Sequence, residues 1–192
     1  MNKYIITLLL IFLFCCNNLV ITQKNEDTKS AVIELISNKS DSIRTICKRG
    51  KIFFAIDPEC PLCISYTNTI NDLYSTFQDS LDFYAFLPSP VYSKEKTDLF
   101  IEKYHFNLPI IVDTNQIITS FLDARTTPEC FLLDNNLNTL YQGLIDNWIK
   151  ELGRKAQNVN SRYLKNAIIS HLKSDSILIT KTNAIGCVIE RF

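Results

Sequence analysis

The chain has no excess of charge of either sign, since 20 Lys and Arg residues are balanced by 20 Asp and Glu residues. A protein that binds nucleic acid needs a surplus of basic side chains to neutralise phosphates, so the balance argues against a nucleic-acid partner. Internal repeats and low-complexity tracts are also missing. Hydrophobic residues make up 46% of the 192 positions, which excludes disorder over most of the chain and suffices for the core of one ordinary domain.

Histidine is scarce as well, with two in the whole chain and neither beside a cysteine. A zinc site built on Cys60-Pro61-Leu62-Cys63 would need a second pair of ligands at similar spacing, and there is no second Cys-x-x-Cys. The absence of a histidine directly after Cys63 excludes covalent haem attachment at this motif. We therefore expect no metal and no cofactor.

The N-terminus carries the pattern of an export signal. Lys3 is followed by an apolar stretch from Tyr4 to Phe14, which is too short to cross a bilayer as a stable helix. Leu13-Phe14-Cys15-Cys16 resembles the lipobox of bacterial lipoproteins. The resemblance implies that Cys16 is the lipid-bearing first residue of the mature chain; a plain secretory signal or an uncleaved anchor is the alternative.

These features predict a lipoprotein signal peptide over residues 1–16 and a tether over residues 17–40, which includes the polar run Thr22 to Ser30. The protein is then exported to the periplasm or cell envelope, anchored by lipid to a bacterial membrane. Such a compartment is oxidising and permits disulfides.

Five cysteines follow the signal, so at least one is unpaired or pairs only transiently: Cys47, Cys60, Cys63, Cys130 and Cys187. Cys130 lies in an apolar strand and is expected to pack in the core. For Cys187 two readings stay open. It forms a structural disulfide with Cys47, or it lies on a flexible tail that folds back and exchanges with Cys60.

The spacing of apolar residues predicts a mixed sheet sandwiched by helices. A strand, a helix and a second strand occupy the first part, and such a unit is parallel and right-handed. The expected strands are Lys51 to Ile56, Leu81 to Leu87, Pro109 to Asp113, Glu129 to Leu133 and Thr139 to Tyr141. The expected helices are 63–77, Ser93 to Tyr104, 117–122 and Ser161 to Leu172.

The pair Cys60 and Cys63 falls where the first strand gives way to the long helix. Unpaired amide donors and the positive end of the helix dipole stabilise an anion there, so a thiol ionises readily. We expect Cys60 to be the more exposed nucleophile and Cys63, one turn along and partly buried, to resolve a mixed disulfide. Pro61 suits the first helical turn, where no amide donor is needed.

The order of these parts resembles the thioredoxin-like superfamily over about residues 45 to 150. A strand, the Cys-x-x-Cys, a long helix and a strand are followed about 65 residues later by Thr127-Pro128, which opens the hairpin. The resemblance implies a three-layer α/β/α sandwich. It also implies that Pro128 is cis and packs against the Cys60–Cys63 disulfide, with Thr127 and Pro61 at the bound substrate. A trans loop proline is the alternative.

Within this superfamily three segments are similar to the bacterial exported redoxin (AhpC/TSA-type) group: Asp57 to Cys63, Thr127 to Asp134 and Gly186-Cys187. We assign the domain to residues 41–150 and a C-terminal helix with a cysteine-containing tail to residues 151–192. The expected function is thiol–disulfide exchange with protein dithiol or disulfide substrates and an envelope electron donor. The direction of electron flow and the oligomeric state stay open.

Two other functions compete with this reading. A thiol-dependent peroxidase would need a threonine or serine three residues before its reactive cysteine, and Asp57 stands there. A non-catalytic binding module would keep Cys60 and Cys63 only as a structural staple.

Overall fold

A computed structural model describes residues 26–37 and 48–192 of the chain. The expected signal peptide, Cys16 and Cys47 lie outside these described residues. The chain divides into two units, residues 1–38 and 39–192. Within the described ranges, no helix combines the length and the apolar character needed to cross a membrane.

In the first unit, residues 26–37 form a helix inside the segment that we predicted to be a tether. Val32 and Ile36, four residues apart, fall on one face. The polar residues at the start of this segment concealed the helical spacing that follows.

The second unit is built on a five-stranded mixed sheet with the order β3-β2-β1-β5-β6. Neighbours β1 and β2, and β2 and β3, are parallel, whereas β5 is antiparallel to both β1 and β6. The predicted α/β class with a mixed sheet is confirmed. The strands are β1 (Lys51–Ala55), β2 (Asp82–Leu87), β3 (Ile110–Val112), β5 (Glu129–Leu133) and β6 (Thr139–Gly143).

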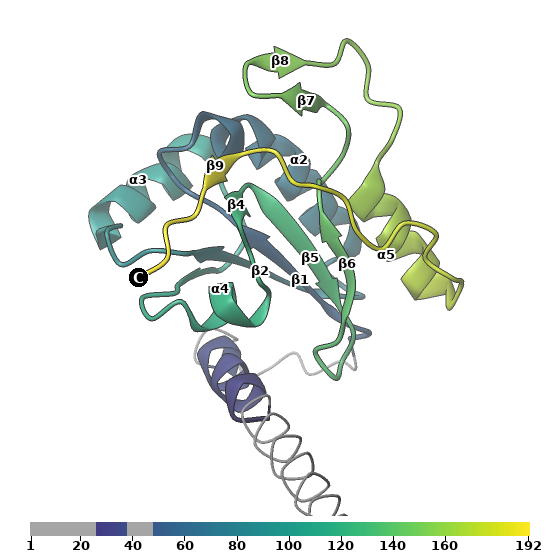
Figure 1. The fold of residues 1–192 in the computed structure, drawn as a ribbon, viewed down its shortest axis with the longest axis horizontal. Coiled ribbons are helices and arrows are strands. Elements are labelled where there is room, and N and C mark those ends of the chain that lie inside the picture. The colour runs from purple at the N-terminus through teal and green to yellow at the C-terminus, as the bar shows by residue number, and fades with distance from the viewer. Residues whose placement is uncertain (1–25, 38–47) are drawn as a thin grey trace, which may run out of the picture. The chain divides into compact units, whose positions relative to one another are not determined.

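Helices cover both faces of this sheet (Figure 1). Helix α2 (Pro61–Phe77) joins β1 to β2, and α3 (Lys94–Tyr104) joins β2 to β3. Both crossovers proceed in the same direction across the sheet, so their right-handedness puts both helices on one face. Helix α4 (Ile117–Phe121) lies on the other side, and α5 (Tyr163–Lys173) packs against β5 and β6.

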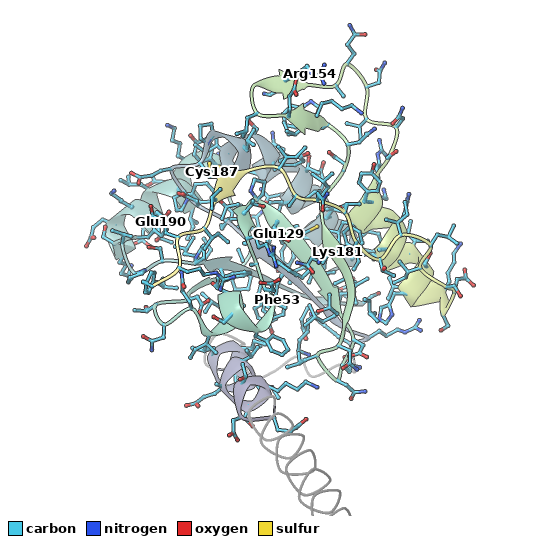
Figure 2. The ribbon with its side chains drawn as sticks, in the orientation of Figure 1. Phe53, Glu129, Arg154, Lys181, Cys187 and Glu190 are labelled. Atoms are coloured by element: carbon cyan, nitrogen blue, oxygen red, sulfur yellow. The ribbon has the colours of Figure 1, made fainter. Side chains whose placement is uncertain are left out.

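The main core lies between the sheet and α2. Phe54 of β1 and Tyr66 and Ile70 of α2 belong to one cluster of buried side chains, to which α5 adds Leu164 and Ile168. Strand residues alternate between faces, so Phe53 points to the other side (Figure 2), where its ring stacks on that of Tyr84 with centroids 5.4 Å apart. Burial on both faces fixes the register of β1.

Four short strands were not anticipated from the sequence. Strands β7 (Ile149–Glu151) and β8 (Arg154–Lys155) form a hairpin ahead of α5. Strand β4 (Thr126–Thr127) precedes β5 and pairs antiparallel with β9 (Cys187–Val188) near the C-terminus. We call residues 174–192, which follow α5, the C-terminal tail; Figure 1 shows it in yellow, passing from α5 to β4.

The packing of α2 on the sheet predicts a large effect of truncation at Ile70, which is fully buried. Replacement Ile70→Ala should lower the free energy of unfolding by about 2–5 kcal/mol, because it removes apolar contacts and leaves a cavity. The control is Asn68→Ala, an exposed position on the same helix, which should change it by less than about 0.5 kcal/mol. Urea denaturation of the full chain measures both, and equal effects would contradict this packing.

Candidate active site

The start of α2 is fixed by a tight turn after β1. The Cys60 N–H donates to the Asp57 carbonyl at 3.1 Å, and the Glu59 N–H donates to the Asp57 side-chain oxygen Oδ1 at 2.7 Å. Cys60 is the N-cap residue of α2, and Pro61 is the first helical residue. The structure therefore places the Cys60 side chain at the helix start, as the sequence predicts.

Three thiols meet at this point. The Sγ atom of Cys60 lies 2.8 Å from the Sγ atom of Cys187 and 3.4 Å from the Thr127 carbonyl oxygen. The Sγ atom of Cys63 accepts a hydrogen bond from the Asp57 N–H at 3.4 Å. All three cysteines are free thiols.

The surroundings lower the pKa of Cys60 and raise those of Cys63 and Cys187. A hydrogen bond from the Cys63 thiol is the largest cause that lowers the pKa of Cys60 to about 5, against the opposing effect of burial. A hydrogen bond from Cys187 and the backbone N–H groups of Cys63 and Leu62 add to this lowering. Burial, followed by the contact with Cys60, raises the pKa of Cys63 well above its usual value. One thiolate is thus flanked by protonated donors.

Nearby charged side chains are engaged with each other on the surface. Glu59 forms an ion pair with Lys96 at 2.9 Å, and Arg125 forms one with Asp123 at 2.8 Å. All four side chains are more than half exposed. Solvent screens such pairs, so the hydrogen bonds around Cys60 dominate its ionisation.

Thr127 and Pro128 form the side of the site opposite the start of α2, where the Thr127 carbonyl oxygen lies 3.4 Å from the Cys60 sulfur. The Thr127–Pro128 peptide bond is cis, as the resemblance implies. The buried carboxylate of Glu129 accepts hydrogen bonds from the N–H groups of Arg125 at 2.8 Å and Thr126 at 3.3 Å. The Glu129 side chain therefore fixes the backbone that leads to Thr127.

Strand β9 occupies the edge of β4 that we expected to receive a substrate peptide. Thr127 pairs with Cys187, and Thr126 pairs with Val188. We expected Cys60 to be the more exposed of the two thiols, but both residues are almost completely buried, at 2% for Cys60 and 1% for Cys63. The physical reason is the C-terminal tail, which places the sulfur of Cys187 directly against that of Cys60.

The other cysteines also find their places. Cys130 is fully buried in the core, as predicted; its thiol donates to the Gly143 carbonyl at 3.2 Å, and burial raises its pKa. Cys187 is a free thiol beside Cys60 rather than a member of a structural disulfide. Of the two alternatives for Cys187, the structure therefore has the tail folded back to Cys60 and not the disulfide with Cys47. Burial, followed by the contact with Cys60, raises the pKa of Cys187 to about 12.

Two cavities lie near the ends of α2. One of about 230 Å³ is lined by Asp57, Tyr92, Thr127 and Val188, among others, so it is bordered by chain neighbours of Cys187 but by no cysteine. A larger one, of about 280 Å³, lies between α2 and the segment before α5, and its lining has no cysteine either. Across residues 26–37 and 48–192, no group of three or more His, Cys, Asp or Glu side chains could hold a metal ion.

Sequence reasoning missed Gly143 and the steric role of Gly186. A Cβ atom at Gly186 would overlap the Thr127 carbonyl, and one at Gly143 would overlap the carbonyl of Thr182 in the tail. Both glycines permit close passage of the C-terminal tail. Glycine is rare in this chain, with four in all, and that rarity was the one sequence feature that could have drawn attention to these positions.

Comparisons with known proteins support the fold. No protein-family model and no curated protein matches the sequence. A hypothetical protein from Sinorhizobium meliloti 1021 is similar in structure, with a TM-score of 0.66, 20% identity, and coverage of 76% of this chain and 81% of the other. An uncharacterized conserved protein from Geobacillus kaustophilus gives a TM-score of 0.64 and 19% identity, with coverage of 76% and 78%.

A protein described as thioredoxin-like, solved in solution in its oxidized form, gives a TM-score of 0.52 and 14% identity, and the match covers 71% of this chain and 86% of that one. At these identities the likeness concerns the fold. Together with the sheet order and the helix positions, it shows that the chain has a thioredoxin-like fold.

The lowered pKa of Cys60 predicts an unusual pH dependence of alkylation. Because Cys60 is already a thiolate at neutral pH, its rate of reaction with iodoacetamide should change less than about twofold between about pH 6.5 and 8.5. An ordinary thiol should gain roughly tenfold per pH unit in the lower part of that range. Mass spectrometry of peptides from the reduced full chain measures each site. A tenfold rise per unit at Cys60 would contradict the assignment.

Proposed function

We propose that the protein is a thiol–disulfide oxidoreductase in which Cys60 is the nucleophile and Cys63 the resolving thiol. The observation that carries the proposal is the placement of Cys60 as the N-cap residue of α2, with Cys63 one turn along the same helix. In that position a hydrogen bond from the protonated Cys63 thiol lowers the pKa of Cys60 to about 5. A thiolate attacks a disulfide, and a protonated neighbour within reach completes the exchange. The thioredoxin-like fold, with its cis bond before Pro128, is consistent with this chemistry.

In the reducing direction, the Cys60 thiolate attacks one sulfur of the substrate disulfide, and the other sulfur leaves as a thiolate that takes up a proton. Cys63 then loses its proton and attacks the Cys60 sulfur, which releases the second substrate thiol. The two enzyme thiols end as a disulfide, and two electrons have passed to the substrate. The oxidising direction is the reverse of these steps.

The electrostatics favour the oxidising direction. Stabilisation of the Cys60 thiolate stabilises the reduced enzyme, which makes the Cys60–Cys63 disulfide a better acceptor of electrons from substrate dithiols. The backbone of Thr127 and the ring of Pro61 border the thiols, so an extended protein segment paired with β4 would bring its cysteine to Cys60. Access to this edge requires that β9 move away.

The N-terminal sequence supports a place in the cell envelope. Under this proposal residues 1–16 direct export, Cys16 carries the lipid anchor, and another envelope thiol protein exchanges electrons with the enzyme. Disulfide exchange with protein thiols suits an oxidising compartment of this kind.

Covalent trapping tests the function. The Cys63→Ser, Cys187→Ser double variant of the full chain should accumulate mixed disulfides between Cys60 and envelope proteins, because neither neighbouring thiol remains to resolve them. The matched control adds Cys60→Ser and should hold no adducts. Non-reducing electrophoresis and peptide mass spectrometry identify the partners. Equal adduct levels in the two variants would refute the proposed nucleophile.

A further inference from the structure

We propose that Cys187 is a third redox cysteine, which forms a disulfide with Cys60 and thereby locks the C-terminal tail over the substrate-binding edge of β4. This inference rests on the proposed function, since it needs Cys60 to take part in disulfide exchange. The geometry that carries it is the 2.8 Å separation of the two Sγ atoms within the β4–β9 pair.

The tail is held along its length, so the contact between the sulfurs is part of a larger docking. Beside β6, the Gln142 N–H donates to the Thr180 carbonyl at 3.0 Å, and the Thr182 N–H donates to the Gln142 carbonyl at 2.9 Å. The Tyr141 hydroxyl and the Thr182 hydroxyl are 2.8 Å apart. These bonds fix the tail before it reaches the thiols.

Further bonds fix the tail after it has passed the thiols. The Ile189 N–H donates to the Arg125 carbonyl at 2.9 Å, and the Gln116 side-chain amide donates to the Glu190 carbonyl at 2.6 Å. Figure 2 shows Cys187 between the two anchored regions, with Lys181 on one side and Glu190 on the other. Cys187 is therefore presented to Cys60 by a segment anchored at both ends.

The backbone of the domain is shaped for this passage. Gly143 has a φ of 132°, and its missing side chain leaves room for Thr182, while Gly186 leaves room for the Thr127 carbonyl. Any other residue at either position would collide with backbone atoms that cannot swing aside. Two of the four glycines in the chain thus lie where the tail crosses the fold.

The exchange needs no outside oxidant once the enzyme is oxidised. Cys187 gives up its proton to solvent, and its thiolate attacks the Cys60 sulfur of the Cys60–Cys63 disulfide. A Cys60–Cys187 bond forms, the bond to Cys63 breaks, and Cys63 leaves as a thiolate that takes up a proton. The number of disulfides is unchanged. The same attack on a mixed disulfide of Cys60 would release the bound substrate as a thiol.

The ionisation of Cys187 follows the state of Cys60. In the reduced site the contact with Cys60 helps to raise the pKa of Cys187, so this thiol stays protonated and donates its hydrogen bond. When Cys60 is in a disulfide, its negative charge is absent and Cys187 ionises more easily. Oxidation of Cys60 therefore prepares Cys187 to attack.

The product is a closed enzyme. The tail already leaves Cys60 only 2% exposed in the reduced state, and a covalent bond would make that cover permanent until a reductant cleaves it. An oxidised molecule would partition between an exchanging form, with Cys60–Cys63, and a locked form, with Cys60–Cys187.

The Cys63→Ser variant of the full chain isolates the proposed bond. After treatment with oxidised glutathione it should contain a Cys60–Cys187 disulfide. It should also retain roughly tenfold less glutathione than the Cys63→Ser, Cys187→Ser variant, because attack by a thiol of the same chain outcompetes attack by a thiol from solution. Peptide mass spectrometry maps the disulfide and the adduct. Equal retention of glutathione at Cys60 in both variants would overturn the role of Cys187 and leave the proposed function intact.

A second oxidant separates the remaining outcomes. If the double variant takes up no glutathione at Cys60, the proposed function is contradicted, and oxidation of Cys63→Ser by diamide then tests the bond alone. A Cys60–Cys187 disulfide supports the inference. A Cys47–Cys187 disulfide, or reduced Cys187 after this treatment, overturns it.

Loss of the glycine that seats the tail gives an independent prediction. Gly186→Ala should displace β9, raise the alkylation rate of Cys60 by roughly tenfold, and reduce the yield of the Cys60–Cys187 disulfide in oxidised protein. Ser176→Ala is the control, because Ser176 is an exposed residue of the same tail. An unchanged alkylation rate at Cys60 in Gly186→Ala, with an unchanged disulfide yield, would contradict the tail as the cover.

Discussion

The pairing of β9 with β4 decides what the redox thiols can meet. The Thr127 carbonyl oxygen lies 3.4 Å from the Cys60 sulfur and is packed against Gly186 of the tail. The same pairing brings Cys187 to Cys60, where its hydrogen bond helps to lower the pKa of the thiol that it covers. The tail therefore conceals Cys60 and contributes a smaller part of its acidity than Cys63 does, so movement of the tail changes access much more than ionisation.

The acidity of Cys60 and its accessibility come mainly from different elements of the structure. The largest lowering of the Cys60 pKa comes from Cys63, one turn along α2, and the backbone N–H groups of the same helix contribute. Helix α2 is held by the core beneath it, and the turn before β5 is held by the Glu129 carboxylate as well as by the tail, so both have support that does not come from the tail. A molecule whose tail has moved aside keeps a thiolate at the helix start. The scaffold sets the chemistry, and the tail sets when it is available.

The sequence predicted the parts of this site that depend on local pattern. A buried strand followed by Cys60-Pro61 and a helical apolar spacing placed the thiol at the helix start, and resemblance to a known fold implied the cis bond before Pro128. It did not predict that Cys60 is covered, because β4 and β9 have two residues each and show no periodicity. Their pairing joins positions about 60 residues apart. The purpose of Gly186 becomes visible only once the neighbouring carbonyl is known.

The C-terminal tail competes with substrates for the β4 edge at a high effective concentration, because it belongs to the same chain. A tethered segment acts at an effective concentration in about the millimolar range, so even a two-residue pairing can exclude weakly bound peptides. Hydrogen bonds at a sheet edge are replaced readily by those of another strand, and a substrate protein that binds additional surface can displace a tail held only in this way. A covalent bond between Cys60 and Cys187 cannot be displaced by binding and must be reduced. The strand pairing is therefore released by a competing substrate, whereas the disulfide is released only by a reductant. A tail that carries a cysteine thus makes access to the β4 edge depend on the redox state of the compartment.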